Sequence, residues 1–206
     1  MILINLLLDR SGSMESVRQE TISSFNEYKN SFENKKGVRF TLMTFDSESI
    51  DTLVLKKKIE DVPDLNAETY QPRAGTPLYD SIATLIKTIE DNKTDKDKVL
   101  AVIYTDGYEN MSREFNRDQI FKLIKKKQEE KWSFVFLGSN QDAWGEGENY
   151  GFVKGNTASL GIGTTSVENA FFVISGSHTL FENSDGNYTE TLVDDVIDNF
   201  GELEES

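Results

Sequence analysis

Residues 2–13 read Ile-Leu-Ile-Asn-Leu-Leu-Leu-Asp-Arg-Ser-Gly-Ser, and this stretch decides the fold. Its first seven residues form a short run with apolar residues on both faces, which is typical of a buried parallel strand. Asp9, Ser11 and Ser13 then occupy the turn at the carboxyl end of that strand. Ligands of open α/β sheets bind at this place. The stretch therefore predicts an α/β sheet with a binding site at the end of its first strand.

The side chains in this turn indicate the kind of ligand. One carboxylate and two hydroxyls are hard oxygen donors, which suit Mg²⁺ or Mn²⁺ better than zinc or copper. The Asp-x-Ser-x-Ser pattern is weak by itself, because Asp and Ser are also common in turns and at helix N-caps. A metal site needs further ligands from elsewhere in the chain.

Composition narrows the class of protein. The chain has 206 residues, enough for one α/β domain with a sizeable core. Its formal charge of -14 argues against a nucleic acid or an anionic membrane as partner, because both attract a basic surface. It contains no Cys, which excludes a disulfide framework and a thiolate nucleophile. Its one His, His178, excludes a multi-His metal site, and we expect it on a helix, at the surface or partly buried.

The sequence also bears on location. No segment approaches the roughly 18 to 20 apolar residues that span a bilayer. The N-terminus lacks a basic region, and Asp9 interrupts its apolar run too early for a secretory signal. We therefore expect a cytoplasmic protein.

Strands and helices alternate along most of the chain. This order predicts a doubly wound, mostly parallel α/β sheet with helices on both faces and right-handed crossovers. We expect one domain over residues 1–200 and an acidic tail over 201–206. Lys122 and Lys125 to Lys127 are expected on a solvated helix face, and Trp132 and Trp144 in the core. The expected strands are 2–8, 38–45, 50–57 (antiparallel, at the edge), 99–104, 133–137 and 157–160, and the expected helices are 14–34, 77–89, 117–131, 142–149, one opening at 165, and about 189–200.

Two further loops supply oxygen side chains. Thr76 precedes the helix opened by Pro77, and Asp106 ends the strand that would lie beside the first one. With Asp9, Ser11 and Ser13 they make five oxygen donors. Mg²⁺ takes six oxygens, so one position would stay open. If the hydroxyls contact the metal and the carboxylates act through water, that open position favours a carboxylate from outside.

These residues resemble a known family. Asp9-Arg10-Ser11-Gly12-Ser13, Thr76 within Ala74–Leu78, and Asp106 within Tyr104–Gly107 are similar to the metal-ion-dependent adhesion site (MIDAS) of von Willebrand factor A (vWA, integrin I-like) domains. The resemblance covers about residues 1–180.

The resemblance implies a fold and a ligand set. It implies a six-strand, Rossmann-like sheet of order 3-2-1-4-5-6 with an antiparallel third strand. It also implies that Ser11, Ser13 and Thr76 bind Mg²⁺ or Mn²⁺ directly, whereas Asp9 and Asp106 act largely through water. Residues 138–144 resemble the stand-alone forms of bacteria and phages.

Three hypotheses for function follow. The first is a non-enzymatic binding domain whose metal accepts an Asp or Glu from a partner protein, with specificity set by loops 46–50, 73–76, 107–113 and 139–144. The second is a metal-dependent hydrolase or phosphoryl-transfer enzyme, although no general base or phosphate-binding motif is evident. The third is a structural subunit whose metal is completed within a homo-oligomer, for example by Glu202, Glu204 or Glu205 of the tail.

Overall fold

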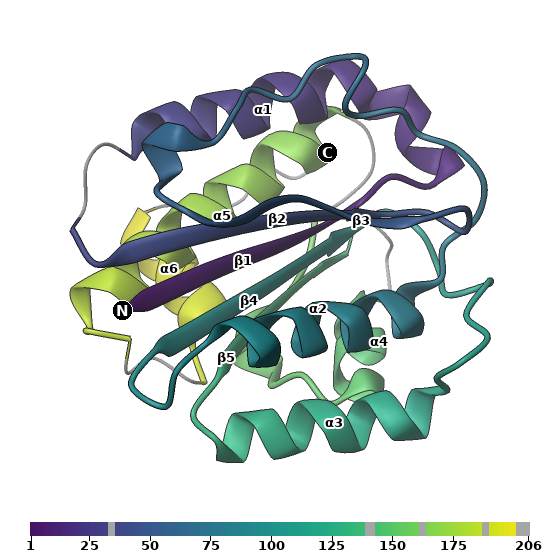
Figure 1. Cartoon of the computed structure of the whole chain (residues 1–206). Helices are drawn as coiled ribbons and strands as arrows, with labels where there is room; N and C mark the ends of the chain where they lie inside the picture. Colours follow the sequence, from purple (N-terminus) through teal and green to yellow (C-terminus); the bar gives the residue numbers. More distant parts are fainter. Residues whose placement is uncertain (33–35, 139–142, 161–163, 187–189, 201–206) are drawn as a thin grey trace.

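Six strands form one sheet in the order β3-β2-β1-β4-β5-β6, as the computed structural model in Figure 1 shows. Neighbouring strands are parallel except β2 and β3, which are antiparallel. The predicted order and the antiparallel edge strand are confirmed. The structure describes residues 1–32, 36–138, 143–160, 164–186 and 190–200. The strands are β1 (Ile2–Asp9), β2 (Val38–Phe45), β3 (Ile50–Lys57), β4 (Lys98–Thr105), β5 (Ser133–Gly138) and β6 (Thr157–Ser159).

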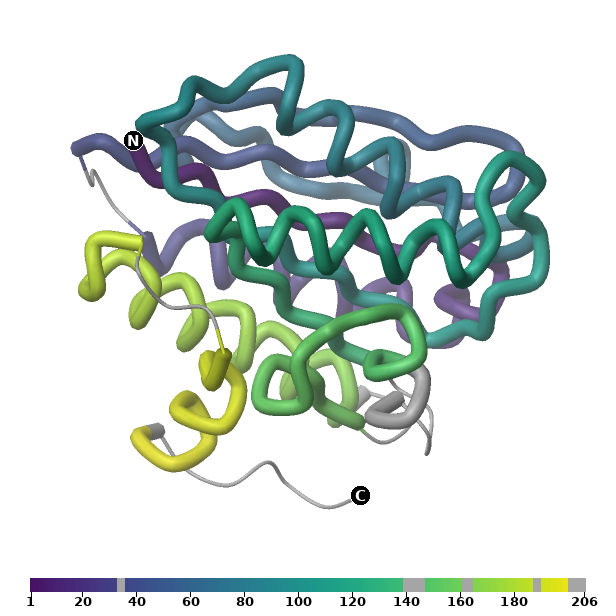
Figure 2. Tube along the Cα trace, turned by 90° about the horizontal axis from the view of Figure 1, so that it is seen from below, coloured from purple at the N-terminus to yellow at the C-terminus, as the bar shows by residue number. Residues whose placement is uncertain are grey.

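Helices cover both faces of the sheet and enclose two apolar cores. α1, α5 and α6 pack on one face, and α2, α3 and α4 pack on the other (Figure 1). Figure 2 shows α6 lying along α5. Among the described residues, no helix combines the length and apolarity needed to cross a membrane. The helices are α1 (Arg18–Ser31), α2 (Leu78–Asn92), α3 (Arg117–Glu129), α4 (Ala143–Tyr150), α5 (Thr164–Asn183) and α6 (Leu192–Phe200), with short 3-10 helices η1 (Gly12–Val17), η2 (Ile59–Asp61) and η3 (Lys154–Asn156).

Several helix starts differ from the prediction. The predicted helix 14–34 begins as the 3-10 helix η1 and becomes α-helical only at Arg18. α5 begins at Thr164, one residue before the predicted start at 165. α6 begins at Leu192 rather than near 189, and the Leu192 N–H donates to Asn156 Oδ1 at 2.7 Å. Asn156 is distant in sequence, so local patterns do not reveal that contact.

Two ionisable side chains are more buried than predicted. Lys127 is only 2% exposed, because its Nζ donates to Glu90 and Glu130 and lies 5.3 Å from the centre of the Trp132 ring. Its apolar stem packs inward while two carboxylates neutralise its charge. His178 is 1% exposed and stacks on Phe32. Trp132 is buried as predicted, and the side chain of Trp144 lies outside the described residues.

The register of the central strands positions the candidate site. Asp9 pairs with Phe45 of β2, and Leu8 pairs with Tyr104 of β4. Thr105 therefore ends β4 at the level where β1 ends, and Asp106 follows directly after it. The chain leaves β1 for α1 on one face and leaves β4 for α3 on the other (Figure 1). This divergence makes the carboxyl ends of β1 and β4 the switch point where α/β sheets bind ligands.

Candidate metal centre

Asp9, the last residue of β1, is a fully buried carboxyl group. Its Oδ1 accepts a hydrogen bond from the Ser11 N–H at 2.6 Å, and its Oδ2 accepts one from the Thr105 hydroxyl at 2.5 Å. The pKa of Asp9 is raised to about 7. Burial is the largest cause and the charge of Asp106 adds to it, whereas the hydrogen bonds from Ser11 and Thr105 partly oppose it. The fold thus holds this carboxyl in one orientation and away from bulk water.

Ser11 and Ser13 connect Asp9 to Asp106. The two serine Oγ atoms are 3.1 Å apart, and Ser13 Oγ donates to Asp106 Oδ1 at 2.6 Å. The Gly12 N–H between them donates to the Ala74 carbonyl at 3.0 Å. This backbone hydrogen bond brings the turn after β1 against the loop that carries Thr76.

Thr76 completes the cluster. It is buried, and its N–H donates to Asn110 Oδ1 at 2.9 Å. A Cβ atom placed on Gly107 would lie 2.8 Å from Thr76 Oγ1, 3.6 Å from Ser13 Oγ and 3.7 Å from Asp9 Oδ2. Oxygens of Asp9, Ser13 and Thr76, from two separate loops, therefore lie within 3.7 Å of one point beside Gly107, and Asp106 of the third loop is hydrogen-bonded to Ser13. The structure brings together all five residues predicted as metal ligands: Asp9, Ser11, Ser13, Thr76 and Asp106.

The charge of this cluster suits a divalent cation. Burial also raises the pKa of Asp106. No ion pair within the described residues includes Asp9 or Asp106. Two adjacent carboxylates without a cation are unfavourable in a buried setting, and a divalent ion would offset both charges.

The donor set also fits a hard metal. Ser11, Ser13 and Thr76 would hold Mg²⁺ or Mn²⁺, and Asp9 and Asp106 would balance its charge. No group of three or more His, Cys, Asp or Glu suited to a metal occurs among the described residues. A metal here would thus depend on the hydroxyls as well as on the two carboxylates.

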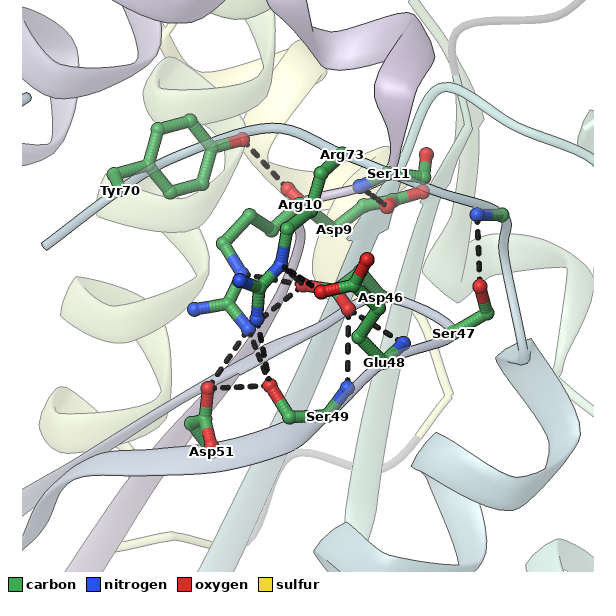
Figure 3. Close-up of polar contacts among 11 residues, drawn as sticks. Asp9, Arg10, Ser11, Asp46, Ser47, Glu48, Ser49, Asp51, Tyr70 and Arg73 are labelled. Carbon is green, nitrogen blue, oxygen red and sulfur yellow. Dashed lines mark hydrogen bonds and ion pairs between the residues drawn. The ribbon is translucent and has the colours of Figure 1, made fainter.

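Two arginines next to the site turn away from it (Figure 3). Arg10 Nε donates to Asp46 Oδ2 at 2.8 Å, and Arg73 Nε donates to the same oxygen at 3.1 Å. Arg10 also donates to Asp51 Oδ2 at 2.7 Å and to Ser49. Both guanidinium groups therefore bind the turn between β2 and β3 instead of the Asp9–Asp106 pair.

These contacts connect three loops: the turn after β1, the turn between β2 and β3, and the loop that carries Arg73. Asp46 Oδ1 accepts the N–H groups of Glu48 and Ser49, which stabilises the turn between β2 and β3. The Arg10 N–H donates to the Phe45 carbonyl at 2.8 Å, and the Arg73 N–H donates to the Arg10 carbonyl at 3.0 Å.

Sequence reasoning missed Thr105 and the Arg10–Asp46 pair as supports of the site. A signal for the pair was present, since Arg10 and Asp46 each directly follow one of two neighbouring parallel strands. Tyr70, whose hydroxyl donates to the Asp9 carbonyl at 2.6 Å, lies in a polar loop and gave no such signal.

Comparison with known proteins identifies the fold. No protein-family model matches the sequence, and no curated protein matches it either. Among solved structures, proximal thread matrix protein 1 of the mussel byssus aligns over 84% of this chain with a TM-score of 0.60 and 17% identity. The vWA domain of SpRpn10 aligns over 82% with a TM-score of 0.56 and 11% identity. This chain has a vWA fold.

The structurally similar proteins differ in chain length and in the metal with which they are described. The chain spans 93% of the SpRpn10 domain but only 46% of the mussel protein. The mussel structure is described with a zinc-occupied MIDAS motif. A manganese-loaded Plasmodium vivax TRAP protein aligns over 68% of this chain and 58% of its own length, with a TM-score of 0.50 and 19% identity. At these identities the likeness is one of fold, and the candidate metal centre rests on the geometry of this chain alone.

Proposed function

We propose that this chain is a non-enzymatic, metal-dependent protein-binding domain. Ser11, Ser13 and Thr76 bind Mg²⁺ or Mn²⁺, and Asp9 and Asp106 balance its charge. The observation that carries this proposal is the gathering of these five oxygen side chains beside Gly107. The bound ion supplies an electrophilic position for an Asp or Glu of a partner protein.

The residues around the cluster leave one side for the partner. Asp9, Ser11 and Thr76 are buried, whereas Ser13 is exposed and Asp106 is half-buried. The cluster thus opens to solvent beside Ser13.

Apolar side chains stand next to that opening. Tyr108 and Met111, in the loop that follows Asp106, are 55% and 39% exposed. A Cβ atom on Gly75 would meet Met111, which places this side chain against the loop of Thr76. The exposed pair gives the partner an apolar contact near its carboxylate. Specificity would then come from loops 46–50, 73–76 and 107–113, while most of the fourth predicted loop, 139–144, lies outside the described residues.

The enzyme alternative has weaker support. A hydrolase or phosphoryl-transfer enzyme would use the same ion as a Lewis acid, usually with cationic groups aimed at the reacting phosphate. Arg10 and Arg73 are the cations nearest the cluster in sequence, and both bind Asp46.

Cellular setting and assembly stay proposals as well. We infer a domain of the bacterial or phage type from the resemblance of residues 138–144, most of which lie outside the described residues, and we separately propose a cytoplasmic setting. The acidic tail 201–206, which would complete a metal site in a homo-oligomer, also lies outside them. Truncation after Phe200, followed by light scattering with and without Mg²⁺, tests that alternative.

Metal binding is tested by deleting one hydroxyl. Thr76→Val keeps the shape of the side chain but removes its oxygen, and titration calorimetry with Mn²⁺ should show affinity reduced by about 10-fold or more. Thr52→Val, at an exposed position on β3, is the matched control and should bind like the wild type. Equal binding by Thr76→Val and the wild type would contradict the proposed metal site.

Partner binding is tested separately. Pull-down from the native source, with Mg²⁺ or with chelator, should lose the same partner in the chelator lane and with Asp106→Ala. Mg²⁺-dependent turnover of a phosphate ester that disappears with Asp9→Ala would instead support the enzyme.

A further inference from the structure

A second concave site lies at the opposite end of the sheet from the candidate metal centre. It is a cavity of about 340 Å³ between the end of α1, the start of β2, η2 and the last turns of α5. Gly37 and Val38 line it, and the Gly37 carbonyl accepts the Ile2 N–H at the start of β1. Because β1 has eight residues, about 25 Å of strand separates this cavity from Asp9. The two sites are therefore physically distinct.

One wall of the cavity is a fixed pair of rings. His178 stacks on Phe32 with ring centroids 3.9 Å apart and planes 11° from parallel. His178 Nδ1 lies 3.0 Å from the Tyr28 hydroxyl, and Nε2 lies 2.9 Å from Glu182 Oε1. These contacts hold the imidazole in one orientation. Phe32 is 6% exposed and His178 1%, so only a small part of each ring faces the cavity, and this part is a fixed patch against which an apolar group can pack.

The mouth of the cavity is basic in an acidic protein. Of the ten described residues that line it, Lys36, Arg39 and Lys58 are cationic. Over the whole chain only 22 of 206 residues are Lys or Arg, and the net charge is -14. Two carboxylates also line it: Glu60 pairs with Lys58 at 3.0 Å, so these two charges offset each other, and Glu182 binds His178. With three cations against two carboxylates, the rim keeps a small positive excess that favours anions, whereas the protein as a whole repels them.

The geometry points to a binding site for a small organic anion with a flat apolar body, such as an aromatic carboxylate. The body packs against the Phe32–His178 wall and Ile59, and the acid group faces the rim cations. A volume of about 340 Å³ lies at the small end of ligand pockets, which run from roughly 300 to 1,000 Å³. This size favours a small molecule over a protein segment. The inference does not depend on the proposed metal function, because it uses none of the same residues.

The test compares 2-naphthoate with its uncharged amide analogue, 2-naphthamide. Each is titrated into the full chain and followed by amide chemical shifts in two-dimensional NMR. Naphthoate should give saturable shifts at Gly37, Val38 and Ile59, without matching shifts at Ser13 or Gly107. Naphthamide should bind several-fold more weakly. Equal binding of the two probes, shifts scattered over the surface, or no shifts at all would each overturn the inference.

Charge variants locate the acid group. Lys58→Gln and Arg39→Gln should each weaken naphthoate binding roughly two- to fivefold and leave naphthamide binding unchanged. Lys126→Gln, at an exposed position on α3, is the matched control and should have no effect. Lys58 has a half-exposed side chain, so its variant keeps the test decisive even if Arg39→Gln is poorly folded. Equal weakening by Lys126→Gln would show a general charge effect and contradict a defined site.

Discussion

Gly107 offers a sharp test of the candidate metal centre, because adding one methyl group there should block it. The Cβ atom of Gly107→Ala would lie 2.8 Å from Thr76 Oγ1, whereas ordinary contact begins at 3.4 Å. The threonine oxygen must therefore retreat by about 0.6 Å. Mg²⁺ requires near-ideal octahedral geometry at roughly 2.0 to 2.1 Å and does not tolerate a shift of that size.

The expected result is a selective loss of metal affinity. We expect Gly107→Ala to weaken Mn²⁺ and Mg²⁺ binding by about 10- to 100-fold in titration calorimetry, the range seen when groups around a metal are displaced. Gly107 is not among the glycines with positive φ, so Ala is compatible with its backbone. Without metal, urea unfolding should therefore show a stability change within about 1 kcal/mol. Wild-type metal affinity in this variant would refute the argument, as would a loss of affinity explained by unfolding.

The remaining predictions concern charged groups away from the cluster. Arg10→Met should destabilise the chain by about 3 kcal/mol in urea unfolding, because Asp46 is buried and would keep only Arg73 as its cation; a change below about 1 kcal/mol would show that Arg73 suffices. The free energy of unfolding of Lys127→Met should stay within about 1 kcal/mol of the wild type, since the side-chain stem still packs and Glu90 and Glu130 are partly exposed. Lys127→Ala should lose about 2 kcal/mol of stability through lost packing. Equal losses in both variants would show that the charge of Lys127, and not its packing, stabilises the fold. Burial raises the pKa of Asp97, but bonds from the Thr94 N–H and the N-terminal ammonium, with the charge of Lys56, lower it to about 2. The stability that ionised Asp97 contributes is thus present above about pH 4 and is lost as the pH falls toward 2. In Asp97→Asn, the free energy of unfolding should therefore depend less on pH between about 4 and 2. An unchanged pH dependence in this variant would contradict the assignment.

Strand ends explain why so much of the fold and the candidate site could be predicted. The apolar runs that became β1 and β4 are recognisable without tertiary information, and the carboxyl ends of adjacent parallel strands share one edge. Asp9 and Asp106 each sit at or directly after such an end. Thr76 could be placed because Pro77 marks the start of the next helix. These positions follow from chain order alone.

Side-chain orientation explains what the sequence did not reveal. Lys127 lies in a lysine-rich segment typical of a solvated face, and only the approach of Glu90 from α2 makes its burial favourable. His178 is buried because Tyr28 and Phe32 of another helix region surround its ring. Such contacts join residues far apart in the chain, and helical periodicity reports the face of a residue without reporting its partners.

The arrangement of charge around Asp9 gives the strongest physical reason to expect a cation. Arg10 lies between Asp9 and Ser11 in the chain, and Arg73 lies three residues before Thr76, so both cations are close in sequence to the cluster. Both instead bind Asp46, whose other oxygen holds the turn between β2 and β3. The same bonds that hold the loops rigid therefore keep protein cations out of the cluster. A cation that entered this oxygen cluster, which is open on the side of Ser13, would offset the charges of Asp9 and Asp106, and under the proposed function it would face a carboxylate of a partner protein.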